Sequence, residues 1–188
     1  TAAGPGMVYL FTQSTPDQTS NFDLLGRIDQ ADFNSNEPGD AFGAAISAAD
    51  YDDDGYIDLV VGAPGEDIGS SSNAGSVFFF RGCERRFGPL VTLDSITDAL
   101  VTGHLPELTN QRQTCNIGLR AWQMLDQPGE SDEENDFFGQ TLTSVDTDAD
   151  GNLDVVVGTP GEAPGSDPDS GYVYFIQSNG GSHPDNFR

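Results

Sequence analysis

The chain has 188 residues, with 31 acidic and 7 basic side chains and a formal net charge of −24. This length is sufficient for a single domain with a sizeable core. The negative charge disfavours nucleic acid and anionic membranes as partners, because both are polyanions. No apolar run approaches the length needed to span a membrane, so membrane insertion is not expected either.

Short segments rich in β-branched and aromatic residues recur along the chain, and turn residues separate them. In chain order we expect strands within 6–11, 25–30, 39–50, 56–62, 75–80, 122–127, 134–146, 152–158 and 171–176. β-Branched and aromatic residues favour strands, whereas Gly, Pro, Asp and Ser favour the turns between them. The sequence therefore predicts an all-β fold, and its periodic apolar segments argue against a disordered chain.

Two acidic loops share one pattern. Residues 50–58 and 146–154 both read D-x-D-x-D-G-x-x-D, and the second begins 96 residues after the first. Carboxylates at positions 1, 3, 5 and 9 suit a hard cation, Gly at position 6 permits a sharp turn, and the carbonyl at position 7 can add a ligand. The expected ligands are Asp50, Asp52, Asp54 and Asp58 with the Tyr56 carbonyl, and Asp146, Asp148, Asp150 and Asp154 with the Asn152 carbonyl.

Two other interpretations of these loops are weaker. An EF-hand requires a bidentate Glu at position 12 and flanking helices, but Val61 and Val157 occupy that position and strand-like segments follow. A solvated acidic turn without a metal is the remaining alternative. It is disfavoured because the spacing occurs twice and the flanking residues repeat as well.

The similarity between the two halves extends well beyond the loops. Phe42-Gly43 precedes the first loop and Phe138-Gly139 precedes the second, and a Val-Val-Gly-x-Pro-Gly-Glu turn follows each, at 60–66 and 156–162. Self-similarity at a fixed period indicates a repeat architecture. Units of four short strands separated by tight turns are typical of β-propeller blades.

At these positions the chain resembles the FG-GAP repeat family, which builds integrin α-subunit propellers and many bacterial surface proteins. The matching marks are Phe42-Gly43 with Gly62-Ala63-Pro64, and Phe138-Gly139 with Gly158-Thr159-Pro160, where Thr159 replaces the usual Ala. The resemblance implies four-stranded blades of a complete or partial propeller, with two structural Ca²⁺ ions bound in the loops at one face. It implies no catalytic activity.

The expected domain organisation is a single FG-GAP repeat domain over 1–188, with about two full repeats and a half repeat at the N-terminus. An insertion at 82–120 interrupts the middle repeat. Propellers usually have roughly 4–8 blades, and fewer blades would leave open strand edges. The chain is therefore expected to be part of a longer protein, to be completed by other chains, or to close in another way.

The apolar residues of two expected strands are predicted to be core. Phe78, Phe79 and Phe80 are expected to pack inside and between blades rather than to form a binding patch. Trp122 and Met124 have a two-residue spacing, which predicts that both lie on one strand face and are buried between blades.

The insertion contains both cysteines of the chain, Cys83 and Cys115, and we predict a disulfide between them. Closing a loop of this length would contribute about 3–4 kcal/mol to stability. Two free buried thiols are the alternative. The insertion also concentrates positive charge that could engage an acidic partner or a second copy, or pair within the chain; its basic residues are Arg85, Arg86, Arg112 and Arg120.

These features favour an extracellular or cell-surface calcium-binding module for adhesion, protein–protein interaction or assembly. Calcium and a disulfide both point outside the cytosol. Neither His104 nor His183 has partners in a catalytic or zinc-binding pattern, so we expect no enzyme. The expected partner is another protein or a second copy, with carbohydrate as a further candidate. The alternatives are a subunit of a surface filament or sheath with blades completed between chains, and an accessory domain of a secreted enzyme.

Overall fold

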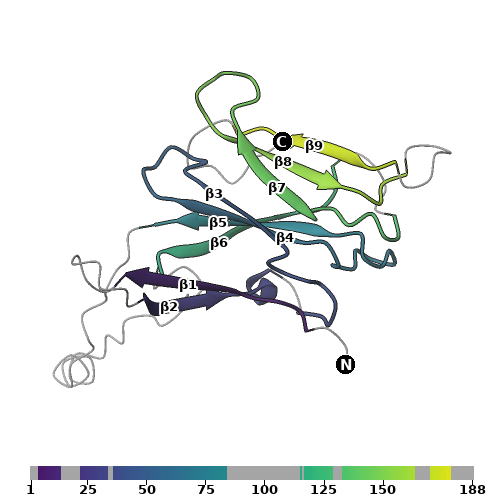
Figure 1. Ribbon diagram of the computed structural model, residues 1–188, viewed down its shortest axis with the longest axis horizontal. Helices are drawn as coiled ribbons and strands as arrows, with labels where there is room; N and C mark the ends of the chain where they lie inside the picture. Colours follow the sequence, from purple (N-terminus) through teal and green to yellow (C-terminus); the bar gives the residue numbers. More distant parts are fainter. Residues whose placement is uncertain are drawn as a thin grey trace, which may run out of the picture.

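The computed structural model describes residues 4–13, 22–33, 36–83, 115, 117–128, 133–163 and 170–178 (Figure 1). Within these ranges the secondary structure consists of nine strands and one 3-10 turn, η1 (Gln30–Asp32). The expectation of an all-β fold is confirmed.

The strands form three antiparallel sheets in which chain neighbours are also sheet neighbours. The sheets stack face against face, with the first at the bottom of Figure 1 and the third at the top. The first sheet contains β1 (Val8–Gln13) and β2 (Phe22–Ile28). The middle sheet contains β3 (Ala45–Ala49), β4 (Asp58–Ala63), β5 (Ser76–Gly82) and β6 (Leu119–Leu125). The third sheet contains β7 (Thr141–Val145), β8 (Asp154–Thr159) and β9 (Tyr172–Ile176).

The sheets repeat in register as well as in sequence. The β3–β4 hairpin pairs Ala49 with Asp58, and the β7–β8 hairpin pairs Val145 with Asp154, 96 residues later. The β1–β2 and β5–β6 pairs share an irregularity, which follows Leu10 in one and Phe79 in the other. The first sheet therefore corresponds to the β5–β6 pair of the middle sheet.

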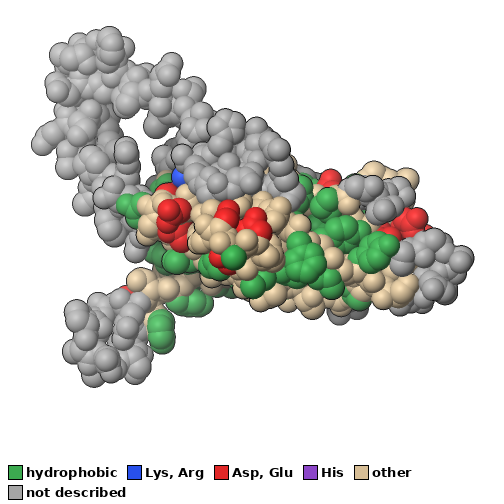
Figure 2. All heavy atoms as spheres, turned by 90° about the horizontal axis from the view of Figure 1, so that it is seen from above, with side chains coloured by type: hydrophobic (Ala, Val, Ile, Leu, Met, Phe, Trp, Pro, Cys, Tyr) green, Lys and Arg blue, Asp and Glu red, His purple; other side chains and the backbone are tan. Residues whose placement is uncertain are grey.

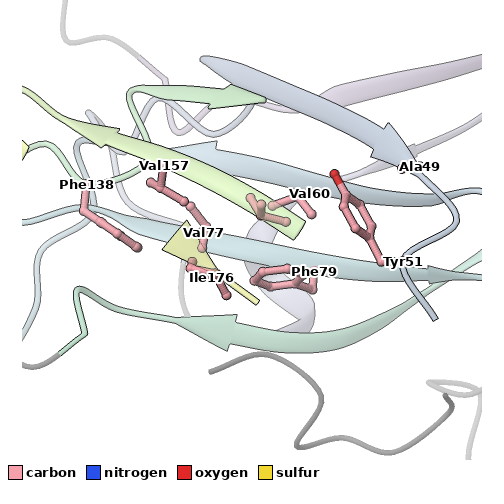
Figure 3. Packing of buried hydrophobic residues seen from close by; sticks show 9 residues of the cluster. Ala49, Tyr51, Val60, Val77, Phe79, Phe138, Val157 and Ile176 are labelled. Atoms are coloured by element: carbon pink, nitrogen blue, oxygen red, sulfur yellow. The ribbon is translucent and has the colours of Figure 1, made fainter. Parts of the chain in front are cut away.

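The main hydrophobic core lies between the middle and third sheets (Figure 3). Side chains alternate between the two faces of a strand, so Val77 and Phe79 of β5 face the third sheet. They pack in one cluster with Val157 and Ile176 of that sheet, and all four side chains are buried. Phe138, from the turn before β7, completes this cluster.

A second core lies between the middle and first sheets. Phe78 and Phe80 project there from the opposite face of β5 and pack with Val8 and Ile28. The ring of Phe42 meets the ring of Phe78 edge to face, with centroids 5.5 Å apart. The prediction that the three consecutive Phe residues are core is therefore confirmed.

The prediction that Trp122 and Met124 share a strand face is wrong. Trp122 packs against the core of the third sheet, whereas Met124 packs against the core of the first. The cause is the irregularity in the β5–β6 ladder, where Phe79 pairs with Gln123 and Phe80 with Ala121. The extra residue on one strand breaks the two-residue alternation.

Candidate metal-binding loops

The two acidic loops join equivalent strands at the same end of the sheets. Residues 50–57 connect β3 to β4, and residues 146–153 connect β7 to β8 (Figure 1). Seen from the side of the third sheet, acidic side chains group toward this end of the molecule (Figure 2). Each loop can turn sharply because Gly55 and Gly151 take positive φ angles of 88° and 96°, which favour glycine.

Backbone N–H groups hold the carboxylates of the first loop in place. Asp50 accepts hydrogen bonds from the amides of Asp54 and Gly55, at 3.1 and 2.9 Å. Asp58, at position 9, is buried and accepts from the amides of Tyr51 and Gly82, at 2.8 and 2.6 Å. Backbone amides of the loop thus surround its acidic side chains, and the bond from Gly82 connects the loop to β5.

The second loop repeats these bonds position by position. Asp146 accepts from the amides of Asp150 and Gly151, at 3.2 and 3.0 Å. Asp154 is buried and accepts from the amides of Thr147 and Ser178, at 2.8 and 2.9 Å. Two loops with different intervening residues therefore share the same backbone hydrogen bonds to the carboxylates at positions 1 and 9.

Each loop gathers three carboxylates closely enough for a metal ion. One oxygen from each of three residues lies within 4.8 Å of the others, and the donor set is entirely oxygen, which fits a hard cation. The first group is Asp50, Asp52 and Asp54, and the second is Asp146, Asp148 and Asp154. Asp58 and Asp150 lie outside these groups. Ligation by any of the ten predicted residues, including the Tyr56 and Asn152 carbonyls, stays a prediction.

A comparison with known protein families matches the FG-GAP repeat at residues 42–80 and 138–176. The chain contains two FG-GAP repeats. Each match begins at a Phe-Gly pair, contains one acidic loop and ends in β5 or β9. FG-GAP repeats are β-propeller blades, and they form modules for protein–protein interaction.

Among curated proteins, the chain is similar to the phosphatidylinositol-glycan-specific phospholipases D of Mus musculus and Rattus norvegicus. It is 28% identical to each over 142 residues. The alignment covers 76% of this chain and 13% of each relative, so the chain spans a small part of their length. In the described part of the FG-GAP chain, no helix is long and apolar enough to cross a membrane.

The two FG-GAP loops differ in what approaches them from the neighbouring strand. Arg81, at the end of β5, forms an ion pair from Nε to Asp52 and places Nη2 3.2 Å from Asp54. The guanidinium also lies 5.8 Å from the ring centre of Trp122, which holds it over the loop. The equivalent residue of the second repeat is the neutral Gln177, whose Nε2 donates to Asp148 at 3.1 Å. Among the residues that the structure describes, only the first loop thus has a positive side chain against its carboxylates.

The carboxyl pKa values also differ between the loops. Burial raises the pKa of Asp52 to about 6, with a further rise from Asp58 that Arg81 partly offsets. Burial likewise raises the pKa of Asp58. Burial also acts to raise the pKa of Asp154, but hydrogen bonds from Thr147 and Ser178 outweigh it, so this pKa is lowered.

Tyr51 links the first loop to the second repeat. Its side chain is buried, and its hydroxyl lies 2.5 Å from the hydroxyl of Ser144 on β7. Its backbone carbonyl accepts a hydrogen bond of 2.6 Å from the Ser178 hydroxyl. The conformation of the first loop is therefore coupled to the packing of the next sheet.

A repeated buried polar cluster was not anticipated from the sequence. Gln30 donates through Nε2 to Asp40 and, at 2.8 Å, to Glu66, and all three side chains are buried. Burial raises the pKa of Asp40, although hydrogen bonds from Glu37 and Gln30 oppose the rise. The second repeat contains the same residues, Gln127, Asp136 and Glu162, and Gln127 donates to Glu162.

The sequence signal for this cluster was the paired segments ending in Gln30 and Gln127, together with the Glu that closes each Val-Val-Gly-x-Pro-Gly-Glu turn. In each cluster the Gln follows the last strand of one sheet, and the acids belong to the turns of the next. The amide therefore joins neighbouring blades.

Cys83 and Cys115 are joined by a disulfide, with their Cα atoms 6.0 Å apart. It closes the insertion between β5 and β6, and the Cys83 amide donates to the Gly118 carbonyl at 3.0 Å beside it. Arg120 lies on β6, directly opposite Arg81 in the antiparallel register of β5 and β6. The other arginines of the insertion and both histidines lie outside the described residues. They are Arg85, Arg86, Arg112, His104 and His183.

Proposed function

We propose that the chain is an extracellular, non-catalytic FG-GAP module that binds other proteins and is stabilised by two structural Ca²⁺ ions. The observation that carries this proposal is the pair of equivalent oxygen-lined loops, each of which gathers three carboxylates within 4.8 Å. Ca²⁺ prefers oxygen ligands in flexible arrangements of six to eight, and carboxylates, carbonyls and water together can supply that number here.

Calcium would act on stability through the loops. Carboxylates crowded together repel one another, and a divalent cation offsets this repulsion. A ligand that binds only the folded state stabilises it by mass action, by about 2.7 kcal/mol at 100 times its Kd. Extracellular Ca²⁺ sites bind on the order of 10⁻⁴–10⁻³ M, so the effect fits the millimolar calcium outside cells. The disulfide supports the same compartment.

The test is thermal unfolding of the chelated protein during a Ca²⁺ titration, with Mg²⁺ as the comparison ion. We expect Asp54→Asn and Asp150→Asn each to remove part of the Ca²⁺-dependent rise in Tm. Asp53→Asn is the matched control. Asp53 is exposed, lies at a position that is not a ligand in the pattern, and has a φ of 54° that Asn tolerates. An unchanged response in Asp54→Asn and Asp150→Asn would refute the ligand assignment.

A second candidate role is that of an accessory domain within a larger enzyme. The observation in its favour is the alignment to part of the two phospholipases D. In that role the FG-GAP blades would hold or orient a catalytic domain, and the Ca²⁺ ions would still be structural. Co-purification with such a domain, with affinity abolished by chelation, would support it.

A further inference from the structure

The two outermost sheets each present an apolar face to solvent. On the third sheet, Val173 and Phe175 of β9 are 57% and 61% exposed. On the first sheet, Tyr9 and Phe11 of β1 are 51% and 58% exposed. Figure 2, which views the molecule from the side of the third sheet, shows hydrophobic side chains gathered on that face. Apolar patches of this kind on soluble proteins mark sites of interaction.

The outer face of the third sheet is equivalent to a face that is covered elsewhere in the same molecule. The 96-residue period relates Val173 to Val77 and Phe175 to Phe79. Val77 and Phe79 are 0% and 1% exposed, because the third sheet packs on them. Equivalent faces of the two sheets therefore differ in burial. The face of the middle sheet is covered by the third sheet, whereas the equivalent face of the third sheet is exposed.

The outer face of the first sheet is the complementary half of such an interface. The shared pattern that starts at Gly6 and at Gly75 relates Tyr9 to Phe78 and Phe11 to Phe80. The ladder irregularities coincide too, so the two pairs of strands present the same faces. On the middle sheet this face is covered by the preceding sheet.

We propose that copies of this chain stack head to tail, with the outer face of the third sheet of one copy packed on the outer face of the first sheet of the next. This proposal rests on the proposed interaction function and names its partner, a second copy. The two faces differ from each other and match the two halves of the internal interface, so the contact is heterologous. Repetition of a heterologous contact gives a ring if it closes and a filament if it does not.

Charge sets the conditions for this association. Each copy has a formal net charge of −24, so copies repel one another. Salt screens that repulsion and leaves apolar contact in place. Stacking is therefore expected to strengthen as NaCl rises from 0.1 to 1 M. Association through the arginines of the chain would weaken over the same range, and that result would overturn the proposal.

The experiment is size-exclusion chromatography with light scattering, over a concentration series in Ca²⁺ and 1 M NaCl. We expect wild-type protein to exceed the 19.9 kDa monomer mass, and Phe175→Asp and Phe11→Asp each to be monomeric. An equimolar mixture of these two variants retains one intact pair of faces, so it should form a 1:1 dimer and nothing larger. Ile46→Asp is the control, because Ile46 is an exposed apolar residue of the middle sheet and should leave assembly unchanged.

Three results would overturn the proposal. The first is wild-type protein that stays monomeric at all concentrations. The second is a Phe11→Asp variant that still assembles, which would indicate contact between two third sheets. The third is a variant mixture that forms no dimer. Because Asp at an exposed strand position can disturb folding, Val173→Ser and Tyr9→Ser provide a milder second pair with the same expected pattern.

Melting curves recorded in Ca²⁺ and in chelator on the same samples separate this proposal from the calcium function. A monomer that Ca²⁺ stabilises would overturn the stacking and leave the calcium role intact. Assembly without any Ca²⁺-dependent stabilisation would support the stacking and overturn the calcium role.

Discussion

Replacing Arg81 by Gln should strengthen Ca²⁺ binding at the first loop. The substitution gives the first FG-GAP loop the residue that the second has naturally, because Gln177 is the equivalent of Arg81. The Arg81 guanidinium contacts the carboxylates of Asp52 and Asp54. A cation bound by those carboxylates must compete with it and is repelled by its charge.

The magnitude follows from the geometry. The distance from Nη2 to the Asp54 carboxylate is 3.2 Å, and Ca²⁺ lies about 2.3–2.6 Å from its ligand oxygens. The guanidinium and the ion would therefore be about 5 Å apart, where the repulsion between one and two unit charges is about 1.7 kcal/mol in bulk water. This corresponds to a roughly tenfold or greater gain in affinity for Arg81→Gln, and partial burial of the pair raises the figure.

The assay is calorimetric titration of the chelated protein in an Asp150→Asn background, in which the second loop is disabled and only the first is measured. Arg81→Lys is the control, since it keeps the charge and loses the planar fork of donors. We expect tight binding with Gln, weak binding with Lys, and a smaller difference between them at high salt. Equal or weaker Ca²⁺ binding in Arg81→Gln would refute the reasoning and would mean that the guanidinium organises the loop for the ion.

Two further predictions concern stability. Phe79→Ala should cost about 3–5 kcal/mol in urea unfolding, because the ring is fully buried between the middle and third sheets; a cost below about 1 kcal/mol would contradict this packing. Cys83→Ser should cost about 3–4 kcal/mol, because the disulfide closes a loop between residues 32 positions apart. In that case wild-type protein under reducing conditions should have the same free energy of unfolding as the variant. A large remaining difference in that free energy would count against the disulfide as the cause.

The features that were predictable from the sequence are those encoded within short segments. The acidic loops, the strands that follow them and the Phe-Gly turns each depend on residues within about a dozen positions, and each occurs twice. The burial of Phe79 was likewise predictable from its position in a short strand-forming segment. Repetition served as a second observation of each pattern and excluded chance matches.

The features that escaped prediction depend on contacts between distant segments. Arg81 lies 27 residues from Asp54, and nothing in its own neighbourhood marks it as a residue of the loop. Gln30 meets Glu66 across 36 residues and two sheets. The opposite burial of Trp122 and Met124 arises from one extra residue in a ladder, and alternation alone cannot locate that residue.

The buried Gln30 and Gln127 clusters affect how this chain can be divided. Residues 42–80 contain one complete FG-GAP match, but the amide that engages Asp40 and Glu66 comes from the segment before it. A fragment cut at the limits of the match would lose both Asp40 and Gln30 and leave the carboxylate of Glu66 without that donor. The smallest repeat unit that keeps this Gln-centred cluster therefore starts at the last strand of one blade and ends after the third strand of the next. Truncations, fusions and circular permutations of this protein should use those limits.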